Sequence, residues 1–316
     1  MAIADRISLG AEVAAAFADG RPVVALESTL ISHGLHYPAN LAVARASEAA
    51  VRAAGAAPAT VAIHDGRLLV GLTDADLETL ATAPPGSVVK AARPNLAAAL
   101  EGGGWAATTV SATMIAAAAA GIRVFATGGV GGVHRGALGG EGRRPTLDIS
   151  SDLEELARTP VAVVCAGPKA ILDLPLTLEF LETRGVPVVA VGQDDLPGFY
   201  SRDSGVRAPA IVADVAGAAR LVDAHLGLGL GSGILVCVPV PEEAALPLEA
   251  ARSAVDRATT EADAAGVHGP ALTPWLLARI AELTDGASLR ANTSLIENDA
   301  GFAGRLAVAL AAIPSS

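Results

Sequence analysis

Lysine is nearly absent from this chain. Only two of its 22 basic residues are lysine, Lys90 and Lys169, and the other 20 are arginine. Arginine stays protonated at any working pH and cannot act as a nucleophilic amine, whereas a desolvated lysine can lose its proton, attack a carbonyl and form a Schiff base. The two lysines are therefore either survivors of codon drift or positions where the chemistry requires a lysine.

Its charge, its cysteines and the lack of long apolar runs exclude several kinds of partner and cellular location. The net charge of −11 argues against a nucleic-acid or anionic-membrane partner, and an anionic substrate would need local positive groups, which the two lysines could supply. The two cysteines, Cys165 and Cys237, lie in apolar runs and are expected to be buried thiols in a reducing compartment. The chain opens without a secretory leader pattern, and its most alanine-rich stretch, 115–121, is too short to span a bilayer. We expect a soluble, cytoplasmic protein.

Strand-like and helix-like segments alternate along the chain. A hydrophobic content of 52% supports a large core even though aromatic residues make up only 3%. This alternation predicts an α/β fold in which helices cover both faces of a mostly parallel sheet (α/β/α), as one domain over residues 1–316. A hairpin is expected around Asp65-Gly66. The predicted strands are 22–26, 59–63, 67–70, 88–89, 122–126, 161–165, 186–191 and 234–238, and the predicted helices are 40–54, 73–80, 109–120, 151–158, 176–183, 242–265, 274–284 and 288–312.

Three side chains that could take part in catalysis follow predicted strands. Lys169 comes after the apolar run Val161-Ala-Val-Val-Cys-Ala-Gly, and Lys90 ends Gly86-Ser-Val-Val-Lys. Glu27 directly follows a buried strand, where a half-apolar setting should raise its pKa and suit it to act as a general acid. Sites in α/β proteins lie at the carboxyl ends of strands. The structural alternative for Glu27 is a capping or ion-pairing role.

A helix begins near Ser150-Ser151-Asp152. With Ser151 as the N-cap and Glu154 three residues later, the pattern predicts a capping box. A helix start flanked by hydroxyl groups is also suited to binding phosphate. Asp148, just before it, is either a turn residue or the single carboxylate that holds a mostly hydrated divalent ion.

The glycine-rich segment 127–136 matches no nucleotide-binding fingerprint. It lacks the GxGxxG spacing, and neither lysine lies in a GxxxxGK[ST] frame. We interpret it as a flexible loop that approaches a ligand. His134, at its end, is either a solvated histidine or a ligand-binding one. Asn292, in the last predicted helix, is either a surface amide or a reader of a nucleobase edge.

Six motifs, in order, carry a family resemblance over nearly the whole chain. They are Ala25-Leu-Glu-Ser-Thr-Leu-Ile-Ser-His-Gly, Thr108-Thr-Val-Ser-Ala-Thr-Met, Phe125-Ala-Thr-Gly-Gly-Val-Gly-Gly-Val-His-Arg-Gly, Asp148-Ile-Ser-Ser-Asp-Leu, Val164-Cys-Ala-Gly-Pro-Lys and Thr273-Pro-Trp-Leu-Leu. Together they resemble the pseudouridine-5′-phosphate glycosidase family, also called the indigoidine synthase A-like family.

The resemblance implies reversible cleavage of pseudouridine 5′-phosphate with water to uracil and ribose 5-phosphate. It also implies a homotrimer with one divalent ion, Mn²⁺, per subunit. Glu27 matches the family's proton-transfer acid, Lys169 its covalent lysine and Asp148 its metal ligand. Substrate contacts are implied for Lys90, Val110 (through its backbone), Ser150, Ser151, Asp152, His134 and Asn292.

The implied reaction explains why these residue types are needed. The bond joins two carbons, ribose C1′ and uracil C5, and carbon leaves poorly unless it is protonated. An imine between Lys169 and the ring-opened ribose would push electrons from C1′, while Glu27 delivers a proton to C5. An ordinary glycosidase with two carboxylates relies instead on an oxygen or nitrogen leaving group.

Three features depart from the family pattern. The loop 136–147 is longer than usual, Pro168 replaces a small residue before Lys169, and a less polar run, Ala-Ala-Arg-Pro-Asn, follows Lys90. None of them removes a residue to which we assign catalysis.

Two rival functions stay open from the residues alone. One is another Schiff-base enzyme that acts on a phosphosugar without dependence on uracil. The other is a phosphosugar or nucleotide sensor in which the lysines only bind phosphate.

Overall fold

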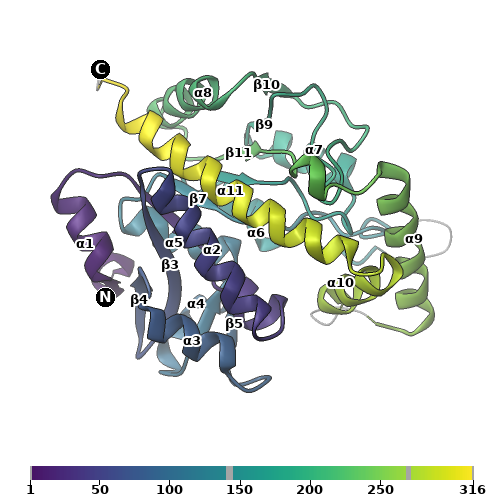
Figure 1. The fold of residues 1–316 in the computed structure, drawn as a ribbon, viewed down its shortest axis with the longest axis horizontal. Coiled ribbons are helices and arrows are strands. Elements are labelled where there is room, and N and C mark those ends of the chain that lie inside the picture. The colour runs from purple at the N-terminus through teal and green to yellow at the C-terminus, as the bar shows by residue number, and fades with distance from the viewer. Residues whose placement is uncertain (1, 140–144, 268–271, 315–316) are drawn as a thin grey trace.

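One mostly parallel sheet forms the centre of the protein (Figure 1). A computed structural model describes residues 2–139, 145–267 and 272–314. The 11-stranded sheet has the order β1-β4-β3-β2-β7-β8-β11-β9-β10, with β6 pairing with both β3 and β5. The strands are β1 (Ile7–Leu9), β2 (Val23–Leu26), β3 (Ala57–His64), β4 (Arg67–Val70), β5 (Val89–Ala91), β6 (Ala106–Thr108), β7 (Val124–Ala126), β8 (Ala162–Cys165), β9 (Val188–Val191), β10 (Ala210–Val212) and β11 (Ile234–Cys237).

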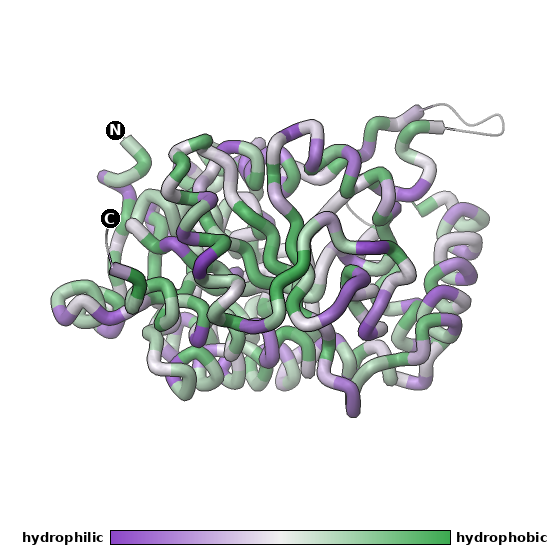
Figure 2. The backbone as a smooth tube through the Cα atoms, turned by 90° about the horizontal axis from the view of Figure 1, so that it is seen from above, coloured by the Kyte–Doolittle hydropathy of each residue, from purple (hydrophilic) through white to green (hydrophobic). Residues whose placement is uncertain are grey.

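Helices cover both faces of this sheet. One face packs against α1 (Ala11–Ala18), α5 (Val110–Ala119), α6 (Ser151–Leu156) and α7 (Leu174–Thr183). The other packs against α2 (Ala39–Ala53), α8 (Val215–Gly227) and the long α11 (Ala287–Ala311). The remaining α-helices are α3 (Asp74–Thr82), α4 (Leu96–Glu101), α9 (Leu248–Ala264) and α10 (Leu272–Leu283). The central strands are strongly hydrophobic (Figure 2), as burial between two helical layers requires.

The predicted α/β/α class and the hairpin are both confirmed. β3 and β4 pair antiparallel with His64 opposite Arg67. The two residues between them, Asp65 and Gly66, have φ values of 48° and 71°. Two positive φ values in a two-residue loop are typical of the turn that matches the twist of a hairpin. Among the described residues, no helix is both long and apolar enough to cross a membrane.

The predicted helix 242–265 is wrong at its start. A short 3-10 turn covers Glu242–Ala244, and α9 begins only at Leu248. Pro247 is the N-cap of α9 and has an extended ψ of 137°. A proline disfavours helical backbone in the residue before it, so the helix starts after Pro247.

The last helix crosses α2 at close range (Figure 1). A Cβ at Gly304 would lie 2.6 Å from the Cβ of Ala54 and 3.2 Å from the carbonyl oxygen of Val51. Gly301, one turn earlier, has more room, because its nearest neighbours would be 3.6 Å and 3.8 Å away. Of these two glycines, only Gly304 is needed for the close approach of α11 to α2.

We predict opposite effects for alanine at these two glycines. Gly304→Ala should destabilise the fold by about 1–3 kcal/mol, because α2 and α11 must separate. Gly301→Ala should be neutral or stabilising by up to about 1 kcal/mol, because alanine favours the helix and fits the space. Urea unfolding of both variants measures this, and equal losses of stability would contradict the close crossing at Gly304.

Candidate active site

Three neighbouring parallel strands bring the candidate residues to one edge of the sheet. Glu27 directly follows β2, Thr127 directly follows β7, and Lys169 lies four residues after β8. β2 pairs with β7 and β7 pairs with β8, both in parallel. The carboxyl ends of parallel strands meet at one edge, so these side chains share it, as the sequence predicted for Glu27 and Lys169. The same prediction for Lys90 is wrong, because β5 continues to Ala91 and Lys90 lies inside it.

Glu27 is a half-buried acid with one strong hydrogen bond. The Thr127 hydroxyl donates to its carboxylate. The next residue fixes the backbone, because the Ser28 hydroxyl donates to the Val61 carbonyl (2.6 Å) and accepts from the Thr108 amide (2.9 Å). Burial raises the pKa of Glu27, while the charge of Lys169 and the bond from Thr127 pull it down less strongly. The predicted raised pKa is supported, and its main cause is desolvation.

Both lysines act electrostatically on the same carboxylate. Lys169 and Lys90 each interact with Glu27, and both lower its pKa. Burial of its ammonium group lowers the pKa of Lys90, the charge of Lys169 lowers it further, and Glu27 and Asp152 oppose this. As whole residues, Lys90 is solvent-exposed and Lys169 is half-buried.

Asp152 is a buried carboxylate that binds backbone amides. It accepts hydrogen bonds from the amides of Ser111 (3.1 Å) and Gly131 (2.9 Å). Ser150 is the N-cap of α6, and its hydroxyl accepts from the Asp152 amide. The predicted capping box with Ser151 as N-cap and Glu154 as its partner is therefore wrong. Its physical reason is that Ser151 already has helical backbone, so the cap falls one residue earlier.

Several hydroxyl groups gather where α5 and α6 begin. The Ser111 hydroxyl lies 3.3 Å from that of Ser151 and 3.2 Å from that of Thr109. It also accepts from the Arg93 amide at 3.1 Å. Val110, the first residue of α5, is buried here. The predicted substrate-contact segments around 110 and 150–152 are thus brought together.

The glycine segment is packed against protein rather than held open for a ligand. A Cβ at Gly129 would lie 2.5 Å from the Phe199 ring, and one at Gly131 would lie 2.2 Å from the Ser150 hydroxyl. Backbone hydrogen bonds join Val130 to Gly167 (3.2 Å) and Lys169 to Val130 (3.1 Å). The interpretation as a flexible loop is therefore wrong, because glycine is needed here for close packing.

His134 and Asp148 adjoin each other. The His134 amide donates to the Asp148 carbonyl at 3.0 Å. Burial lowers the pKa of His134, Asp148 acts in the opposite direction, and Lys169 lowers it. Within the described part of the chain, the Asp148 carboxylate makes no hydrogen bond or ion pair. No cluster of three or more metal-binding side chains occurs among residues 2–139, 145–267 and 272–314. One free carboxylate fits only an ion that keeps most of its water.

Asn292 lies on α11, one turn before the residues that contact the glycine segment. A Cβ at Gly128 would meet Ile296 at 2.8 Å and Leu295 at 3.1 Å. Asn292 is half-buried, and its amide has no hydrogen-bond partner among the described residues. The structure thus places it near the segment without bringing it into contact with Glu27 or Lys169. Residues 140–144 of the long loop 136–147 lie outside the described residues.

Two cavities adjoin the catalytic candidates. A cavity of about 530 Å³ is lined by Pro168, Lys169, Ser201 and Arg252, among others. A much smaller one, of about 10 Å³, lies behind Glu27 and Thr127. Lys169 therefore has room beside it for a ligand of small-molecule size.

Sequence reasoning missed two residues that the structure places in the site. Thr127 directly follows a predicted strand, so the rule that selected Glu27 would also have selected it. The Ser111 amide donates to Asp152, and its hydroxyl contacts the hydroxyl of Ser151, both about 40 positions away in the sequence. No local sequence pattern predicts a contact between residues so far apart.

The sequence also matches a known family. Residues 12–309 match the family profile of the indigoidine synthase A like proteins. The chain belongs to this family. It is 55% identical over 307 residues to a pseudouridine-5′-phosphate glycosidase from Jannaschia sp. (strain CCS1), with 96% of this chain and 98% of that protein covered. A pseudouridine-5′-phosphate glycosidase from Solibacter usitatus is 53% identical over 304 residues, which cover 96% and 99% of the two chains.

Solved structures of family members share the fold. The prealnumycin C-glycosynthase AlnA, in complex with ribulose 5-phosphate, superposes with a TM-score of 0.87 at 39% identity, covering 97% of each chain. An indigoidine synthase A-like protein from Thermotoga maritima superposes with a TM-score of 0.83 at 32% identity, covering 96% of each chain.

The raised pKa of Glu27 makes its contribution to stability depend on pH. The folded protein binds the Glu27 proton more tightly than the unfolded chain does. The free energy of unfolding therefore falls as the pH rises from the ordinary glutamate pKa of 4.5 through the raised pKa of the folded state. We predict that Glu27→Gln removes this loss. Its melting temperature should exceed that of the parent by an amount that grows as the pH rises from about 4.5 through the raised folded pKa.

A control of opposite sign is Glu261. Arg279 and Arg257 lower its pKa to about 2, so Glu261→Gln should lower the melting temperature at neutral pH, by less as the pH falls. Parallel pH dependence of the two variants would contradict the opposite shifts.

Proposed function

We propose that this protein catalyses the reversible cleavage of pseudouridine 5′-phosphate, with water, to uracil and ribose 5-phosphate. The observation that carries the proposal is the placement of Glu27 and Lys169 at the carboxyl ends of neighbouring parallel strands, with Lys90, inside β5, acting electrostatically on the same carboxylate. Relatives more than 50% identical over nearly the full length bear the matching name. AlnA, whose name describes C-glycoside synthesis, was solved with a sugar phosphate.

Glu27 is the proposed proton donor to uracil C5. Burial raises its pKa, so it holds its proton nearer to neutral pH than an exposed glutamate. The Thr127 hydroxyl donates to one carboxylate oxygen and fixes the orientation of the group. The protonated C5 then carries away the bonding electrons as a neutral uracil.

Lys169 is the proposed nucleophile. Its amine would displace the ring oxygen O4′ from C1′, which opens the ribose. The nitrogen lone pair would then move toward C1′ as the bond to the protonated C5 breaks with its electrons on uracil, which leaves the sugar joined to Lys169 as an imine. Water then hydrolyses the imine and releases ribose 5-phosphate. Lys90 acts electrostatically on the same carboxylate, and its positive charge suits it to hold the phosphate.

The hydroxyl groups at the starts of α5 and α6 suit the same phosphate. Ser150 and Ser151 can donate to it, as can the backbone near Val110. Asp152 plays a different part, because its carboxylate already accepts the amides of Ser111 and Gly131. We infer that Asp152 fixes the two loops and does not touch the phosphate with its side chain. His134 and Asn292 remain proposed contacts of the base.

Asp148 is the proposed single protein ligand of a hydrated Mn²⁺, with His134 beside it. Such an ion would supply Lewis-acid polarisation of a uracil carbonyl. Among the described residues, the Asp148 carboxylate makes no hydrogen bond or ion pair, so it is available to such an ion. We also propose, from the family, a homotrimer.

Borohydride trapping tests the covalent step. With ribose 5-phosphate, reduction should attach one sugar phosphate to Lys169, as located by peptide mass mapping. Lys169→Arg should abolish the adduct and lower turnover by roughly 10³-fold or more, whereas the charge-matched control Lys90→Arg should keep the adduct. Uracil-dependent formation of pseudouridine 5′-phosphate separates this function from another phosphosugar enzyme. An adduct on Lys90 would reassign the nucleophile, and binding without any adduct would favour a sensor.

Removing the Asp148 carboxylate tests the metal site. Asp148→Asn should weaken Mn²⁺ binding by at least the roughly 10–100-fold that loss of an outer-shell partner costs. Electron paramagnetic resonance of free Mn²⁺ measures this without an activity assay. Asp256→Asn, which alters an exposed ion pair with Arg135, is the control. Unchanged affinity in Asp148→Asn would place the ion elsewhere.

A further inference from the structure

Glu27 must regain a proton after each turnover. In the proposed reaction, its proton ends on uracil C5 while substrate fills the space between Glu27 and Lys169. Because Glu27 is half-buried and bound substrate would cover its exposed side, a route for protons from the other side would be useful. The residues on the α2 side of Glu27 offer such a route.

The first step is the small cavity behind Glu27. Its volume of about 10 Å³ is close to the minimum that admits one water molecule. Four of its lining residues carry polar groups: Glu27, Thr127, Ser47 and Thr60. A buried water needs two to four polar partners, roughly, and this cavity provides them.

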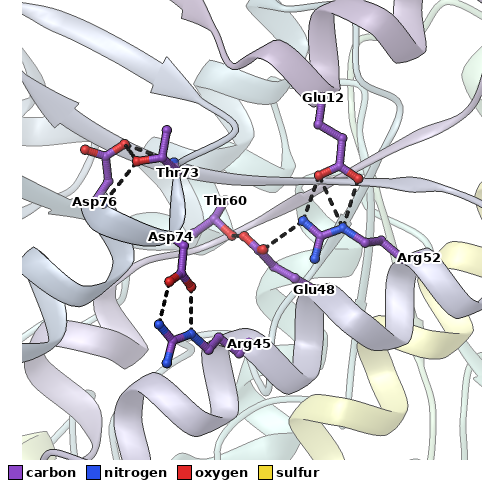
Figure 3. A network of polar contacts seen from close by, with 8 residues as sticks. All are labelled: Glu12, Arg45, Glu48, Arg52, Thr60, Thr73, Asp74 and Asp76. Atoms are coloured by element: carbon purple, nitrogen blue, oxygen red, sulfur yellow. Dashed lines mark hydrogen bonds and ion pairs between the residues drawn. The ribbon is translucent and has the colours of Figure 1, made fainter.

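The second step leads from this cavity to Glu48. Thr60 is 2% exposed, and its hydroxyl donates to the Glu48 carboxylate at 2.6 Å. Glu48 itself is 6% exposed. Its other oxygen accepts from Arg52 at 3.1 Å, and Arg52 also binds Glu12 at 2.7 Å (Figure 3). The chain of contacts therefore runs from the cavity behind Glu27 outward through α2.

The third step reaches solvent. Glu48 lines a surface cleft of about 330 Å³ together with Glu12, Arg45, Arg52 and Asp74. Glu12 and Arg52 are 42% and 46% exposed in their side chains. Thr60 thus lines the inner cavity, Glu48 lines the outer cleft, and one short hydrogen bond joins them.

We propose that Glu48, Thr60 and one water molecule in the small cavity form a proton relay that reloads Glu27. A proton from solvent binds the Glu48 carboxylate and passes to the Thr60 oxygen, as the Thr60 hydroxyl proton passes to the water. The water passes one of its protons to Glu27. One proton enters and one reaches Glu27, so charge and atoms balance. Synthesis runs the relay in reverse. This inference rests on the proposed role of Glu27.

Single-turnover and steady-state rates together test the relay. The first turnover uses the proton already on Glu27, so Thr60→Val should form uracil at the parent rate when enzyme is in excess. Its steady-state kcat should fall by about tenfold, less than the roughly 10²–10⁴-fold contribution of a general acid. Thr60→Ser restores the hydroxyl and should restore kcat. Glu48→Gln keeps an acceptor for Thr60 but cannot carry the proton, so it should behave like Thr60→Val.

Glu12→Gln is the matched control, because it weakens the outer pair with Arg52 without touching Thr60, and should change neither rate. Equal losses in single-turnover and steady-state rates would show that Thr60 and Glu48 are only structural. Parent-like rates in Thr60→Val and Glu48→Gln would show that Glu27 is reloaded from the substrate side. Borohydride trapping on Lys169 does not depend on the relay. If trapping fails, the proposed function fails; if trapping succeeds and kcat is unchanged, only the relay fails.

Discussion

Close packing of the segment 128–132 is the constraint on which the site depends. Its glycines approach neighbours so tightly that a Cβ at Gly128, Gly129, Gly131 or Gly132 would lie within 3.0 Å of another atom. Because no side chain separates the backbones, the segment can hydrogen-bond directly to Gly167 and Lys169 on one side, and its Gly131 amide can donate to the Asp152 carboxylate on the other. The position of the proposed nucleophile is therefore set by backbone contacts, which tolerate less variation than contacts between long side chains.

The sheet edge could be predicted from the sequence, but the contacts across it could not. Alternating hydrophobic runs give the parallel sheet, and the strand-end rule then locates Glu27 and Lys169. The same rule also applies to Thr127, which directly follows β7. The glycines of 128–132 pack against residues that are distant in sequence, such as Phe199 and Ser150, so their spacing alone cannot distinguish close packing from approach to a ligand. Elements with few residues or little hydrophobic contrast, such as β1 and β6, were also missed, because three residues give too little pattern.

The two lysines of the site are positive, whereas the chain as a whole is acidic. The chain carries a net charge of −11, which repels an anionic substrate at long range. Within the site, Lys90 and Lys169 act on Glu27 and on each other, and Asp152 partly offsets them. Salt screens the long-range repulsion over about 8–10 Å, while a partly buried cluster is screened less. Local lysines can therefore hold a phosphate even though the surface as a whole is acidic.

Cleavage of a carbon–carbon bond requires Glu27 both to donate a proton to the substrate and to be reprotonated afterwards, and different residues on its two sides serve these requirements. On the substrate side, Lys169 must be near enough to form an imine, and its charge pulls the pKa of Glu27 down. Burial pushes that pKa up and prevails, which keeps a proton available for a carbon atom, a slow proton acceptor. The same burial limits the contact of Glu27 with bulk water, so an acid that is effective in one turnover becomes harder to reload for the next. Thr60 and Glu48, on the α2 side, resolve this conflict without opening the site to solvent.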